Sequence, residues 1–188
     1  MARLCYASEV QVPELMRQAD LPESTPSANA FRMFANAPAV GAATLRLVFA
    51  LLTETDLDPK LRELVILRAA QRCECRYAWV QHVAIARGVG VEEAQIAALE
   101  CGETPPTLFD ERVYMAFVIA DDILANCPAV DQTFATAQKQ FNLASADELD
   151  VETLVARMET EALACHRQLI GPLQFRLDPI VVSERAPC

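Results

Sequence analysis

Apolar positions recur along the chain at the spacing of an α-helix. After Asp58 and Pro59, which are typical of a helix start, Leu61, Leu64 and Val65 fall at helical intervals. The same periodicity, bounded by prolines and glycines, predicts helices over residues 9–18, 29–36, 40–52, 59–73, 74–87, 91–100, 110–126, 131–141 and 150–170. No segment of any length alternates in the manner of a β-strand. The sequence therefore predicts an all-α fold.

The domain organisation follows from the same pattern. Residues 1–28 hold three prolines and predict an irregular lead-in with one short helix. Residues 29–172 predict a single helical domain, and residues 173–188 a tail. Within the domain, the segment 40–52 is apolar on all sides, which favours a buried helix.

Composition narrows the classes of function. The chain has 188 residues, 53% of them hydrophobic and 22% charged, which suits one folded domain with a sizeable core. A net charge of -10 argues against a nucleic-acid partner, and no apolar run is long enough to span a membrane. Five glycines form no phosphate-binding loop. Seven cysteines without framework spacing, and no long apolar stretch among the first ten residues, predict reduced thiols in a cytoplasmic protein.

One segment departs from the acidic character of the rest. Residues 60–88 contain six Lys and Arg against two Glu, while the flanking segments are acidic. Basic groups around a pocket would favour an anionic substrate. Alternatively, these arginines form a solvated helix face or pair with acidic side chains elsewhere in the chain.

The same segment holds the residues that are suited to chemistry. Cys75 is expected near the start of a helix, where backbone N–H groups stabilise a thiolate. His82 lies seven residues later and so shares its face, and Glu63 on the preceding helix could approach both. A carboxylate, a thiol and an imidazole would form a proton-transfer set. The alternative is structural: a core cysteine, a packed histidine, and a glutamate paired with Arg62, with Arg68 or with an arginine of the next helix.

A metal site is not expected. The chain has two histidines, lacks an H-E-x-x-H motif, and spaces Cys73 and Cys75 too closely for a zinc knuckle. The second histidine, His166, lies late in the last expected helix. It could reach the pocket of a neighbouring subunit, but a structural role is favoured.

Three motifs together resemble the carboxymuconolactone decarboxylase and alkylhydroperoxidase D-like superfamily over about residues 57–100. They are L-R-E-L-V-I-L-R at 61–68, W-x-x-H-x-x-x-A from Trp79, and G-V-G-V-E-E-A-Q-I at 88–96. The resemblance implies an all-helical bundle that assembles as a homo-oligomer, a trimer or a hexamer. It also implies a pocket in or near the subunit interface, beside the helix that carries the histidine.

The resemblance implies roles for single residues as well. In the hydroperoxidase branch, Glu63 would be the proton-relay glutamate, Cys75 the first cysteine and His82 the histidine. The second cysteine of that motif falls on Ala78, so the dithiol relay is not expected. Cys73 cannot simply replace it, because a two-residue offset on a helix points the side chain elsewhere.

Three functions follow. The first is a lyase or isomerase without metal or organic cofactor, similar to the decarboxylase branch, acting on a small anionic cyclic substrate. His82 would be the acid or base and Glu63 its partner; Arg72 or Arg76 would bind a carboxylate. Tyr77 and Trp79 could line the pocket or belong to the core. The second is a thiol peroxidase that uses Cys75 alone, resolved by an outside thiol. The third is a catalytically silent helical binding module.

Overall fold

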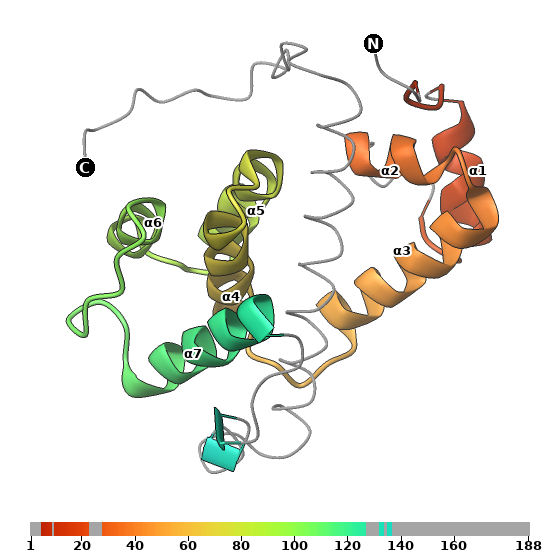
Figure 1. Ribbon diagram of the computed structural model, residues 1–188. Coiled ribbons are helices and arrows are strands. Elements are labelled where there is room, and N and C mark those ends of the chain that lie inside the picture. The colour runs from red at the N-terminus through yellow and green to blue at the C-terminus, as the bar shows by residue number, and fades with distance from the viewer. Residues whose placement is uncertain (1–4, 9, 23–27, 127–131, 134, 137–188) are drawn as a thin grey trace.

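The computed structural model describes residues 5–8, 10–22, 28–126, 132–133 and 135–136 (Figure 1). Regular structure in these ranges is helical, which confirms the all-α prediction. Its helices are α1 (Gln11–Gln18), α2 (Asn29–Phe34), α3 (Pro38–Thr53), α4 (Pro59–Arg72), α5 (Arg76–Gly88), α6 (Glu93–Glu100) and α7 (Glu111–Asn126). Of the helix expected over 131–141, residues 132–133 and 135–136 are described, and they are helical. The helix expected over 150–170, the tail 173–188 and His166 lie outside the described residues. In the described part, no helix is long and apolar enough to cross a membrane.

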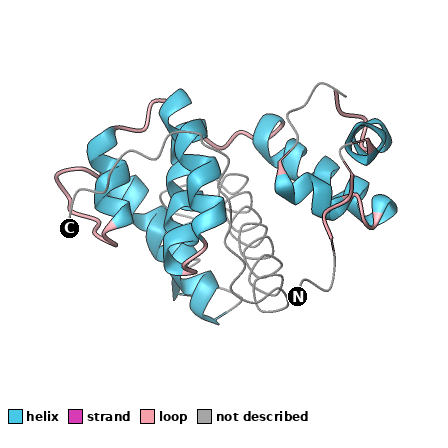
Figure 2. Ribbon diagram, turned by 90° about the horizontal axis from the view of Figure 1, so that it is seen from above, coloured by secondary structure: helices cyan, strands magenta, loops and turns pink. Residues whose placement is uncertain are grey.

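The helices form two packed groups (Figures 1 and 2). Helices α1, α2 and α3 pack on one another around a core that includes Leu15, Met16 and Leu45. Helix α4 is the centre of the second group, because α5, α6 and α7 all pack against it. A hydrogen bond from the backbone N–H of Ala30 in α2 to the Tyr77 hydroxyl in α5, 3.1 Å long, joins the two groups.

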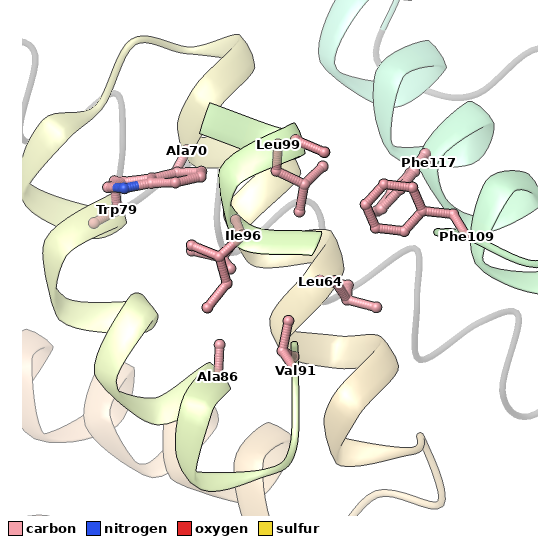
Figure 3. Close-up of a cluster of buried hydrophobic side chains, with 12 residues drawn as sticks. Leu64, Ala70, Trp79, Ala86, Val91, Ile96, Leu99, Phe109 and Phe117 are labelled. Carbon is pink, nitrogen blue, oxygen red and sulfur yellow. The ribbon is translucent and has the colours of Figure 1, made fainter. Parts of the chain in front are cut away.

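The second group is built around two apolar clusters on α4. One gathers side chains of α4, α5, α6 and α7, among them Leu64, Ile96, Leu99 and Phe117 (Figure 3). The other joins Leu61 and Val65 of α4 to α7. With α4 enclosed in this way, even its polar residues Arg62 and Glu63 are buried.

Local sequence sets the two ends of α4. The Asp58 side chain accepts a hydrogen bond from the backbone N–H of Leu61 at 2.8 Å, and Pro59 occupies the first turn. At the other end, the backbone N–H of Cys75 reaches the carbonyl of Ala70 at 2.8 Å. Glu74 takes the left-handed conformation, with φ of 54°, that a helix terminator of this type requires. Residues 73–75 therefore form a turn, and the next helix begins at Arg76.

The expectation that segment 40–52 is buried is wrong in part. Gly41, Ala42 and Leu45 face the core of the first group, whereas Val40 is 69% exposed and Leu47 is 46% exposed. Helix α3 packs on α1 and α2 through one face, so its apolar character on the opposite side does not lead to burial there.

The prediction of reduced thiols holds for some of the cysteines. Cys5 and Cys75 carry free thiols, whereas Cys101 is disulfide-bonded.

Candidate active site

Glu63 and His82 meet between α4 and α5. Oε2 of Glu63 lies 2.9 Å from Nδ1 of His82, within hydrogen-bonding distance. The Glu63 side chain is fully buried, and the His82 side chain retains 16% of its exposure. The pair thus has a buried carboxylate at one end and a ring that solvent can reach at the other.

This geometry sets the tautomer of a neutral His82. An ionised carboxylate can only accept a hydrogen bond, so Nδ1 must carry the proton and donate it to Glu63. Nε2 is then the unprotonated nitrogen, with its lone pair free to accept a proton. A ring held in one tautomer by a buried carboxylate is the arrangement of a general base and its orienting partner.

Arg62 adds a positive charge to the same place. Its Nε lies 3.6 Å from Oε1 of Glu63, close enough for an ion pair but too far for a hydrogen bond. Both atoms are fully enclosed, and neither has a hydrogen-bond partner within the described part of the chain. From the sequence, Arg62 is only a structural alternative for pairing with Glu63, so its place at the site is a finding of the structure.

Cys75 is the N-terminal cap residue of α5, in agreement with its expected place at a helix start. Its free side chain is partly buried and packs against the core cluster of α4 to α7. Among the described residues, it makes no hydrogen bond to Glu63 or His82. Ala78, where a second cysteine would stand, is buried in the same cluster.

The other arginines of the basic segment are paired with acidic side chains. Asp121 of α7 takes two hydrogen bonds from Arg68, at 3.0 and 2.7 Å, and lies 3.4 Å from Nε of Arg72. Arg76 pairs with Glu100 at 2.9 Å. The expected carboxylate binders, Arg72 and Arg76, thus have protein partners and make no ion pair with Glu63.

The pairing continues at the end of α5. Arg87 makes two hydrogen bonds to Glu93, at 2.6 and 2.9 Å. They hold the pKa of the Glu93 carboxyl below its ordinary value. The basic character of segment 60–88 is therefore largely compensated by neighbouring acidic residues.

Tyr77 and Trp79, which could line a pocket or belong to the core, both make contacts within the helical bundle. Tyr77 receives the hydrogen bond from Ala30, and Trp79 is 6% exposed within the core cluster (Figure 3). A hollow of 440 Å³ lies near the starts of α4 and α7, lined by residues that include Lys60, Gln95 and Arg112. Glu63 and His82 do not line that hollow. Within the described ranges, no three His, Cys, Asp or Glu side chains are grouped so as to hold a metal ion.

Comparison with known proteins agrees with the resemblance seen in the sequence. Residues 38–115 match the model of the carboxymuconolactone decarboxylase family. The match runs from the start of α3 into α7 and includes both Glu63 and His82. A search of curated proteins found no match.

Proposed function

Residues 38–115 belong to the carboxymuconolactone decarboxylase family, and from this premise we propose that the protein is a lyase or isomerase that needs no cofactor. Its substrate is a small anionic cyclic molecule on which a proton is moved. The observation that carries the proposal is the contact between the buried Glu63 carboxylate and Nδ1 of His82.

The proposed chemistry uses the free nitrogen of the ring. Nε2 of His82 removes a proton from a carbon next to a carbonyl group, and the electron pair moves into the carbonyl to form an enolate. The ring is then positively charged, and Glu63 stabilises that charge at close range. Returning the proton to a different carbon completes an isomerisation.

A decarboxylation uses the same parts. Carbon dioxide leaves, its bonding electrons form the enolate, and a protonated His82 delivers a proton to the carbon. Neither sequence of steps consumes an oxidant or reductant. The direction of the proton transfer depends on the substrate, which the family alone does not specify.

A substrate screen tests this function. Lactones and related cyclic ketones that carry a carboxylate are incubated with the protein, and products are identified by NMR spectroscopy. We expect turnover of one member of the panel, and a loss of at least about 100-fold in kcat for His82→Ala. Turnover that His82→Ala leaves unchanged would contradict the proposal.

A second candidate is a thiol peroxidase that uses Cys75. The free thiol at the start of α5 favours it, because backbone N–H groups at a helix start stabilise a thiolate. Its lack of a hydrogen bond to His82 and the alanine at position 78 favour proton transfer instead.

The resemblance to the family also implies an oligomeric assembly. We propose a homo-oligomer of three or six subunits in the cytoplasm, without nucleic acid or membrane as a partner. Sedimentation equilibrium measures the mass of the assembly independently of its shape. A monomer at micromolar concentration would contradict the assembly without bearing on the chemistry at His82.

A further inference from the structure

Arg62 is a buried cation for which the described part of the chain provides no hydrogen-bond acceptor. Its side chain is 7% exposed, and Nε is enclosed without a partner. The nearest acidic atom, Oε1 of Glu63, is 3.6 Å away and is itself an enclosed acceptor without a hydrogen bond. Buried guanidinium groups in folded proteins are normally hydrogen-bonded, because losing water without a replacement acceptor is unfavourable.

Three other arginines of segment 60–88 differ from Arg62 in this respect, and the fourth, Arg72, is half exposed. Arg68, Arg76 and Arg87 each form a hydrogen-bonded ion pair, and Arg72 lies 3.4 Å from Asp121. Arg62 is more buried than any of them. The arginine with the least access to water is therefore the one with the poorest set of acceptors.

The positive charges around Arg62 outnumber the negative ones once His82 is protonated, so binding of a further anion would be favourable there. Glu63 supplies one negative charge. Its Oε1 faces Arg62 and its Oε2 faces His82. When His82 accepts a proton, two positive charges face this single carboxylate. Nε is fully enclosed, so the 7% exposure of the side chain lies on its other atoms. The terminal nitrogens of the guanidinium are not among the enclosed unpaired atoms, and they are the donors left for a ligand.

Resting on the proposed function, we propose that Arg62 binds the carboxylate of the substrate. A carboxylate matches the two parallel N–H groups of a guanidinium and would supply the missing acceptors. The position of Arg62 beside Glu63 keeps the bound anion next to the His82 ring. The substrate class is thus a small carboxylic acid that approaches His82 with its carboxylate on Arg62, not on Arg72 or Arg76.

Anion binding tests this assignment without any turnover. Malonate and acetate are titrated into ¹⁵N-labelled protein, and the Nε–Hε signals of the arginines are followed by NMR spectroscopy. The Arg62 signal is assigned from its loss in Arg62→Lys. We expect a saturable shift of that signal, and an affinity for malonate that falls at least about tenfold in Arg62→Met. The matched variant Arg72→Met should bind malonate as the native protein does.

Several results would overturn the assignment. They are equal malonate affinity in a folded Arg62→Met variant, a shift confined to Arg72 or Arg76, and no saturable shift with either anion. If Arg62→Met does not fold, Arg62→Lys decides, because lysine keeps the charge but loses the paired donors. Native affinity in Arg62→Lys would then overturn the proposal.

The anion measurement is independent of the proton-transfer function. Anion binding that depends on Arg62, in a protein whose turnover does not depend on His82, would overturn the proposed function and retain the binding site. Turnover that depends on His82, together with malonate binding that does not depend on Arg62, would support the proposed function and overturn the assignment of Arg62.

Discussion

Oε2 of Glu63 lies 2.9 Å from Nδ1 of His82, although the two residues are 19 positions apart and lie on different helices. The tight turn at residues 73–75 returns the chain so that α5 packs on α4. The contact buries a carboxylate completely while its histidine partner stays accessible. This asymmetry suits proton transfer, because the charge that orients the ring is shielded while the ring itself keeps part of its exposure to solvent.

Replacing the carboxylate by its amide tests the role of Glu63. Glu63→Gln keeps the shape of the side chain but removes the negative charge and the preference for one ring tautomer. We expect kcat to fall by about 100-fold or more on a substrate found in the screen. Circular dichroism must show that the variant is folded. A folded Glu63→Gln variant with native kcat would show that the contact is structural.

The ion pair between Arg68 and Asp121 should contribute to the stability of the second helix group. Its two hydrogen bonds are short, and the side chains are 11% and 28% exposed. Asp121→Asn should lower the free energy of unfolding by about 1.5–3 kcal/mol. The matched change Glu100→Gln removes the exposed partner of Arg76 and should cost less than about 1 kcal/mol. Urea denaturation measures both, and equal losses would contradict this ranking.

Replacing either of two glycines by alanine should change the stability of the protein, in opposite directions for the two positions. A Cβ atom at Gly41 would lie 2.5 Å from the backbone oxygen of Phe34, whereas one at Gly88 would meet nothing within 4 Å. Gly41→Ala should destabilise the protein by about 1–3 kcal/mol, because α2 and α3 would have to separate. Gly88→Ala should stabilise it by about 0.5–1 kcal/mol through helix propensity. Thermal unfolding of the two variants checks the signs, and a stable Gly41→Ala would refute the close approach.

Peroxide reactivity separates the two enzymatic candidates. The protein is exposed briefly to about one equivalent of an organic hydroperoxide with a sulfenic-acid trap, and labelled cysteines are identified by mass spectrometry. We expect Cys75 to label no faster than Cys73, and Cys75→Ser to retain native turnover of the lyase or isomerase substrate. Rapid labelling confined to Cys75 would favour the thiol peroxidase.

Much of the fold could be predicted from the sequence, because capping residues and apolar periodicity are local signals. Asp58 and Pro59 mark the start of α4, and Gly90, with φ of 87°, follows the end of α5. The turn at residues 73–75 was less visible. Its left-handed position holds Glu74, where glycine is the usual residue, so no breaker separates Cys73 from Cys75.

The arginines around the site were harder to predict from the sequence than the contact between Glu63 and His82. Helical spacing indicated that Glu63 and His82 could approach each other. It could not show that Arg72 and Arg76 have acidic partners, because Asp121 and Glu100 come from other helices. Nor could it show the burial of Arg62, since the enclosure of α4 depends on how α5, α6 and α7 pack around it. Tertiary packing also decided which face of α3 is covered.

Hydrogen–deuterium exchange at an enolisable carbon tests directly whether His82 transfers a proton. A carboxylated lactone or cyclic ketone is incubated in deuterated water with native protein, His82→Gln or His166→Gln, and loss of the proton signal is followed by NMR spectroscopy. Native protein and His166→Gln should exchange at the same rate, and His82→Gln should be slower by at least about 100-fold. Equal rates for native protein and His82→Gln would contradict proton transfer by His82.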